Sequence, residues 1–116
     1  MINKKLKSFI LENKKGFTID LKDNKIITPK YKKGFYVGIT NNSNANIDLL
    51  ISRVLYLKQV TFKDISTFIG GWSNEGLFYL DLSLYVKNFK DAVILGKKFN
   101  QKSIYSIFKN DCINLK

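Results

Sequence analysis

Residues 65–86 read ISTFIGGWSNEGLFYLDLSLYV, two apolar segments on either side of a short polar one. Both apolar segments are rich in aromatic and β-branched residues, which favour strands. The polar segment 73–76 carries Ser, Asn and Gly, residues that are typical of turns. We therefore expect a β-hairpin, with one strand over 65–72, a turn at 73–76 and a long second strand over 77–86.

A helix is expected on each side of this hairpin. Asn46 is a candidate N-cap, and the apolar residues that follow it recur at helical spacing, which predicts a helix over 47–59. Asn88 is a candidate cap in the same way for a helix over 89–99.

Strands are expected at the outer ends, over 35–40 and 101–108, with a polar loop at 41–46 and a polar tail after the last strand. Residues 34–108 then run strand, helix, strand, strand, helix, strand. This is the ferredoxin-like βαββαβ order, an antiparallel sheet with two helices on one face. The expected fold class is α+β.

The N-terminal part is expected to extend this core. Apolar residues on one helical face predict a short helix within the first thirteen residues, and a small hairpin follows over 16–28. The chain has 116 residues, 45% of them hydrophobic, which suits one packed domain over 1–116. Within it we expect an extension over 1–30 and an α+β core over 34–108, which a basic connector joins.

Several kinds of site are not expected from the composition. Cys112 is the single cysteine and there is no histidine, which leaves neither a disulfide framework nor a Cys/His zinc set. Asp64, Asp81 and Asp91 stand alone in the sequence, so we expect no metal and no cofactor. No apolar run approaches the roughly 20 residues of a membrane-spanning helix, and the basic N-terminus does not resemble a secretory signal. The expected location is the cytoplasm.

The net charge of +11 is the strongest compositional feature. One interpretation is a polyanionic partner such as nucleic acid, or an acidic protein face. The other is that an AT-rich genome encodes many lysines and that these only solvate the surface. Arg53 is the single arginine, and bidentate readout of bases usually needs arginine forks, so any nucleic-acid binding should be weakly sequence-specific.

Partner contacts are expected at the lysine-rich segments if these converge in space, and at the single tryptophan. A tryptophan near a hairpin tip either anchors a protein interface or closes the end of the core. Further basic segments lie at Lys4-Lys5-Lys7 and Lys14-Lys15. The predicted partner-binding residues are Lys30, Lys32, Lys33, Trp72, Lys97, Lys98 and Lys102.

Four tyrosines lie on predicted strands and are open to two interpretations. Exposed rings on a four-stranded sheet stack bases in RNA-recognition modules. The signature of those modules is missing here, and the alternative is packing in the core. The four residues are Tyr36, Tyr79, Tyr85 and Tyr105.

Residues 34–40, GFYVGIT, resemble part of the core of GIY-YIG nucleases. Such an enzyme needs a second similar element, a catalytic arginine and a metal-binding glutamate in fixed order. The second element is absent, and nothing beyond their residue types marks Arg53 and Glu75 for these roles. We therefore expect a binding protein and not an enzyme.

A second resemblance covers residues 70–105, about a third of the chain. It rests on Gly70-Gly71-Trp72, on 79–83 and on the segment from Ala92 to Tyr105. These residues resemble short open reading frames of bacterial phages and other mobile elements. The resemblance implies a small accessory protein in the host bacterial cytosol, similar in role to anti-CRISPR proteins, which block a host defence complex.

Two functional hypotheses follow. The first is a non-catalytic, phage-type inhibitor that binds a host protein or nucleoprotein complex, such as an RNA-guided nuclease, by steric occupation. The alternative is direct, weakly sequence-specific binding of DNA or RNA through the lysine patches. Neither hypothesis involves a membrane.

Overall fold

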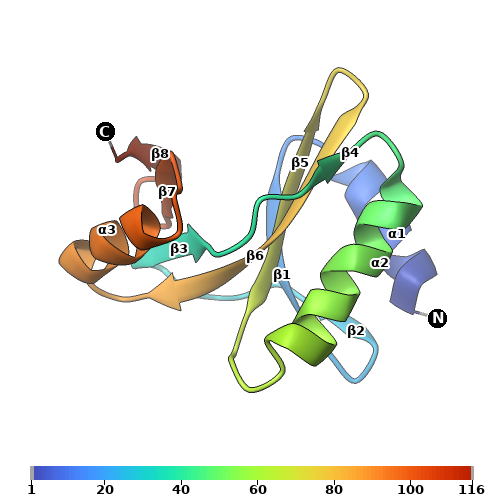
Figure 1. Ribbon diagram of the computed structural model, residues 1–116, viewed down its shortest axis with the longest axis horizontal. Coiled ribbons are helices and arrows are strands. Elements are labelled where there is room, and N and C mark those ends of the chain that lie inside the picture. Colours follow the sequence, from blue (N-terminus) through green and yellow to red (C-terminus); the bar gives the residue numbers. More distant parts are fainter. Residues whose placement is uncertain (1, 116) are drawn as a thin grey trace.

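The structure is a computed structural model that describes residues 2–115. These residues form three α-helices, one π-helical turn and an antiparallel sheet of eight strands, so the expected α+β class is confirmed (Figure 1). The helical elements are α1 (Ile2–Glu12), α2 (Ile47–Tyr56), the π-helical turn η1 (Leu57–Thr61) and α3 (Phe89–Lys98). The strands are β1 (Phe17–Lys22), β2 (Lys25–Ile27), β3 (Phe35–Gly38), β4 (Ser43–Asn44), β5 (Phe68–Asn74), β6 (Leu77–Val86), β7 (Ser103–Ser106) and β8 (Asp111–Asn114).

The predicted hairpin of residues 65–86 is confirmed as the β5–β6 pair, but its turn is tighter than expected. β5 runs from Phe68 to Asn74, so the predicted strand over 65–72 and turn over 73–76 are wrong in their bounds. Glu75 and Gly76 have φ of 51° and 81°, the positive values of a two-residue hairpin turn. Because two residues suffice to reverse the chain, Ser73 and Asn74 stay paired with β6.

The sheet order is β2-β1-β5-β6-β3-β7-β8, with β4 beside β6. β3 and β4 both pair with β6, but Gly38 pairs with Ser83 and Ser43 with Tyr79, so five steps on one side match four on the other. This extra residue is a β-bulge. The predicted polar loop over 41–46 is therefore wrong in part, because its middle continues along β6.

All three α-helices cover the same face of the sheet. Side chains alternate between the two faces of a strand, and paired residues of antiparallel strands share a face. The larger core cluster contains Leu6 of α1 and Ile51 of α2 together with Leu82 of β6. The smaller cluster joins Ala92 of α3 to Val37 of β3, which pairs with Leu84 on the same face as Leu82. Figure 1 shows α1 and α2 at one end of this twisted sheet and α3 at the other.

The caps predicted for α2 and α3 are confirmed. The side chain of Asn46 accepts from the N–H of Leu49, and that of Asn88 accepts from the N–H of Asp91. The helix predicted over 47–59 continues past Tyr56 as η1, whose wider turn reaches Thr61.

Two further segments differ from expectation at the ends of the core. The predicted strand over 101–108 is shorter, and the predicted polar tail is wrong, because β8 pairs with β7 and places Ile113 opposite Ile104.

The small N-terminal hairpin is confirmed as β1–β2, and it extends the sheet beyond β5.

Candidate functional site

The face of the sheet without helices carries a row of tyrosines. Tyr36 lies at the centre of the row, paired with Tyr85 of β6 on one side and with Tyr105 of β7 on the other. Its neighbour Val37 is fully buried against the helices, so Tyr36 faces the opposite side. The ring of Tyr36 lies 6.1 Å from that of Tyr85 and 6.4 Å from that of Tyr105.

A fourth tyrosine reaches this row from the connector between β2 and β3. The ring of Tyr31 stacks on Tyr85 with the ring centres 3.7 Å apart and the planes within 7°. It also meets the edge of Phe68, 6.1 Å away, which is 8% exposed. Tyr31 itself is 45% exposed. We call this group the Tyr31 cluster; it consists of Tyr31, Tyr36, Phe68, Tyr85 and Tyr105.

The connector is held against the sheet at its end. The hydroxyl of Tyr85 donates to the carbonyl of Lys33 at 2.8 Å. Gly34 follows with φ of 104°, and a Cβ atom there would lie 2.5 Å from the Tyr85 hydroxyl. Only glycine suits both the conformation and the close approach. The end of the connector is therefore held against Tyr85, on which the ring of Tyr31 stacks.

Burial shapes the ionisation of this cluster. Desolvation, together with the neighbouring hydroxyls of Tyr31, Tyr85 and Tyr105, raises the pKa of Tyr36 to about 12. Burial, then the nearby Cys112 and Asp111, raises the pKa of Tyr105. Both hydroxyls therefore keep their protons to a higher pH than an ordinary tyrosine does, and Tyr105 donates to the side chain of Asn110.

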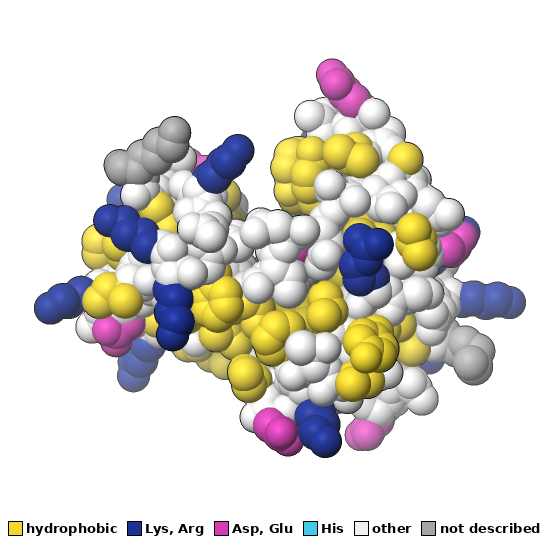
Figure 2. All heavy atoms as spheres, viewed as in Figure 1, with side chains coloured by type: hydrophobic (Ala, Val, Ile, Leu, Met, Phe, Trp, Pro, Cys, Tyr) yellow, Lys and Arg dark blue, Asp and Glu magenta, His cyan; other side chains and the backbone are white. Residues whose placement is uncertain are grey.

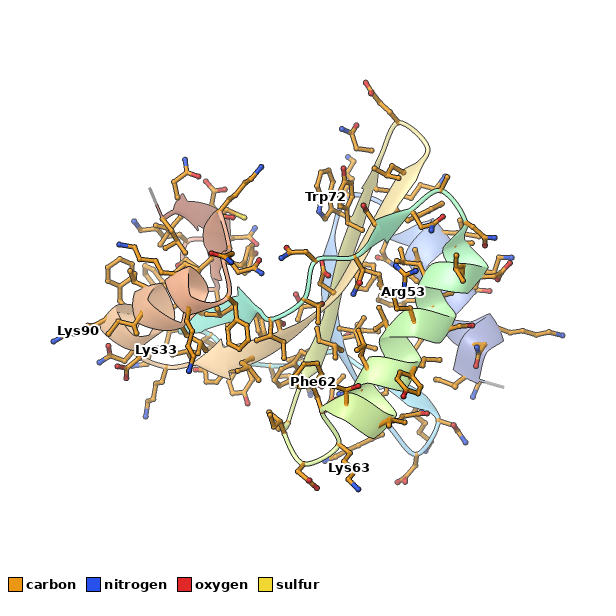
Figure 3. All side chains as sticks on the ribbon, in the orientation of Figure 1. Lys33, Arg53, Phe62, Lys63, Trp72 and Lys90 are labelled. Atoms are coloured by element: carbon orange, nitrogen blue, oxygen red, sulfur yellow. The ribbon has the colours of Figure 1, made fainter. Side chains whose placement is uncertain are left out.

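A second stacked pair lies on the same face near the hairpin turn. Trp72 of β5 pairs with Tyr79 of β6, and their rings stack with centres 4.3 Å apart and planes within 6°. Trp72 is 46% exposed and lies on the side of the hairpin away from α2 (Figure 3). It does not close the end of the core, which was one of its two expected roles. We call Trp72 and Tyr79 the Trp72 pair.

The predicted lysines fall into two separate groups. Lys30, Lys32 and Lys33 are exposed neighbours of Tyr31 in the sequence of the connector, and Figure 3 shows Lys33 near α3. Lys97 and Lys98 end α3, on the helix-covered side of the sheet, and Lys102 precedes β7. In the view of Figure 2, which has α2 and α3 toward the reader, lysine and arginine side chains are scattered and form no continuous patch.

No family model, curated protein or solved structure matches this chain.

The two residues considered for nuclease chemistry, Arg53 and Glu75, belong to separate elements. Arg53 lies exposed on α2 and Glu75 in the β5–β6 turn, and no hydrogen bond or ion pair between described residues joins them. Within residues 2–115 no three His, Cys, Asp or Glu residues lie close enough together to hold a metal ion. Nor does any helix in this range have the length and apolar character to cross a membrane.

Sequence reasoning missed two members of the Tyr31 cluster. Phe68 was counted only as part of a strand, and Tyr31 lies outside every predicted strand. One signal was present for Tyr31: it is an aromatic residue among lysines, between Pro29 and Gly34. A rigid residue before it and a permissive one after it are typical of a connector with a defined path.

Proposed function

We propose that this protein binds single-stranded nucleic acid with weak sequence specificity, through base stacking on the Tyr31 cluster. One observation carries the proposal. The ring of Tyr31 is exposed and stacks on Tyr85 on the helix-free face of the sheet, and the exposed residues Lys30, Lys32 and Lys33 lie beside it in the sequence. Aromatic rings for bases, next to cations for phosphates, are what sequence-tolerant binding of single strands requires.

The strand order supports the same proposal. We propose that residues 34–108 form a ferredoxin-like unit, since their four main strands lie in the order β5-β6-β3-β7 and all pair antiparallel. β6 and β3 are then the two central strands, and they carry Tyr85 and Tyr36. RNA-recognition modules place their stacking rings on a four-stranded sheet in a similar way.

The chemistry favours single strands over duplexes. Bases in a duplex are stacked on one another, so their faces are not accessible to a protein ring. The one arginine, Arg53, lies on α2, which covers the other face of the sheet. Lysine contacts phosphate as a point charge and distinguishes sequences weakly. We therefore expect similar affinity for single strands of different sequence.

Fluorescence anisotropy with labelled single- and double-stranded oligonucleotides at low salt tests the proposal. Tyr31→Ala should weaken single-strand binding about fivefold or more, because stacking one base contributes roughly 1–3 kcal/mol. Tyr56→Ala is the matched control, since Tyr56 is 60% exposed but belongs to α2. Equal effects of the two substitutions, or equal affinity for duplex and single strand, would contradict the proposal.

The phage-type inhibitor remains a second candidate, and one observation favours it. The outer surface of α2 and η1 exposes Leu49, Tyr56 and Val60, which are 48%, 60% and 51% exposed and recur at helical spacing around Arg53. An apolar stripe with an arginine suits a protein interface. Inhibition of a purified RNA-guided nuclease that is lost in Tyr56→Ala and kept in Tyr31→Ala would support this candidate.

A further inference from the structure

The two stacked pairs lie toward opposite ends of one strand. Tyr85 and Tyr79 both belong to β6, six residues apart, and an even separation puts them on the same face. At roughly 3.3 Å per residue, they are about 20 Å apart. Each carries a stacked partner that is nearly half exposed, Tyr31 at 45% and Trp72 at 46%.

On β5, the surface between the two pairs has small side chains, whereas on the β3 side the Gln101 side chain lies over Gly38. On the helix-free face of β5, Gly70 is the one residue between Phe68 and Trp72, so β5 has no side chain between these two rings. Gly70 pairs with Asp81, whose carboxylate is turned to the bulge, where it accepts from Thr40 and from the N–H of Asn42. A bound strand would therefore meet no bulky residue on β5 between the two pairs.

A lysine-bearing loop from a distant part of the sequence lies beside the Trp72 pair. The N–H of Ser73 donates to the carbonyl of Lys14 at 2.9 Å, which brings the loop with Lys14 and Lys15 next to the end of β5. Both lysines are exposed. The Trp72 pair thus combines, as the Tyr31 cluster does, an exposed stacked ring with lysines on a neighbouring segment.

We infer that the Trp72 pair is a second stacking site for the same single strand, which runs along β6 between the two pairs. This inference rests on the proposed function and adds a requirement for length. Stacked nucleotides follow one another at about 3.4 Å, so a strand of roughly six nucleotides reaches both sites. Shorter strands occupy one site at a time, whereas longer strands gain affinity because the second contact is intramolecular.

The test uses oligothymidylates of about three and about ten nucleotides with the full chain. Anisotropy should show at least tenfold tighter binding of the longer strand, and Trp72→Ala should remove most of this gain while Trp72→Phe retains it. Because Trp72 is the single tryptophan, its fluorescence reports this site alone, and the longer strand should quench it. Retention of the gain by Trp72→Phe shows that loss of the fold does not cause the effect of Trp72→Ala.

The outcomes separate the inference from the proposed function. One outcome contradicts the second site alone. In it, the longer strand binds and Tyr31→Ala weakens this binding, but Trp72→Ala binds as tightly as the unaltered protein, and the Trp72 fluorescence of the unaltered protein does not change. The proposed function then stands. If neither oligonucleotide binds at low salt, both fail together, and the Trp72 pair is then open to a protein partner.

Discussion

Asp81 shows how one residue fixes the sheet at its irregular point. Its Oδ1 accepts from the Thr40 hydroxyl at 2.8 Å and from the N–H of Asn42 at 2.6 Å, so it bonds both sides of the β3–β4 bulge. Burial nevertheless raises the pKa of Asp81, and the two hydrogen bonds offset only part of that effect. The carboxylate oxygen is thus needed, while its charge is a cost.

This division predicts opposite results for two substitutions. Asp81→Ala should lower the free energy of unfolding by about 2 kcal/mol, because the bulge loses its acceptor. Asp81→Asn keeps an acceptor oxygen without the buried charge and should be at least as stable as the unaltered protein at pH 7. Urea denaturation of both variants measures this. Equal destabilisation by the two substitutions would show that the charge itself is required.

The raised pKa of Asp81 also predicts that the stability of the protein depends on pH. A raised pKa means that the folded state binds the proton more tightly than the unfolded state does. Asp81 therefore contributes stability below its ordinary pKa of 3.8, and that contribution is lost as the pH rises through the raised value. Urea denaturation from below pH 3.8 up through the raised pKa should show this loss of stability in the unaltered protein and a smaller loss in Asp81→Asn.

At the scale of elements, η1 joins α2 to the sheet. The wider turn contains Lys58, whose ammonium lies over the strands. It donates to the carbonyl of Thr67 and, at 3.0 Å, to the hydroxyl of the same residue. It also lies 3.5 Å from the Asp20 carboxylate. Thr67 is 1% exposed, so its polar atoms depend on this partner. The π-helical turn thus positions a cation that three groups share.

Lys58→Met should therefore destabilise the protein by about 2 kcal/mol, since it leaves buried polar groups without a partner. Lys63→Met is the matched control, because Lys63 is exposed just beyond the same turn (Figure 3). Thermal unfolding of the two variants makes the comparison. A control variant as unstable as Lys58→Met would mean that loss of positive charge, and not of these contacts, matters.

The elements also show what the sequence can and cannot predict. The strand over 77–86 and the caps at Asn46 and Asn88 follow from local preferences, and they were predicted correctly. The bulge and β8 depend on which strand lies beside them, and pairing between distant segments leaves no local pattern. The polar composition of β8 even resembles a tail, because β8 is an edge strand in which only Ile113 is partly buried.

The candidate site shows the same division. Tyr36, Tyr85 and Tyr105 could be assigned to strands from the sequence, but only the register places them in one row on the face away from the helices. The position of Tyr31 depends on the path of the connector, which no periodic pattern describes. Residue types were thus predictable, and their convergence was not.

For the whole molecule, the decisive question is which part of the +11 charge meets phosphate. On the proposed function, the lysines beside Tyr31 contact the strand, whereas those at the end of α3 do not. Each phosphate contact on a single strand adds about 0.7 to the slope of log K against log salt. Replacing Lys30, Lys32 and Lys33 by Gln should thus reduce the slope by about 2.

Replacing Lys97, Lys98 and Lys102 by Gln removes the same charge from the other group and is the matched comparison. If the whole positive field attracts nucleic acid without a defined site, the two triple variants should lose affinity and slope alike. If the strand lies on the helix-free face, only the first variant should lose slope, and the second should differ from the unaltered protein by little more than its association rate. Anisotropy titrations over about 50–300 mM salt distinguish the two, because phosphate-driven affinity falls by orders of magnitude in this range.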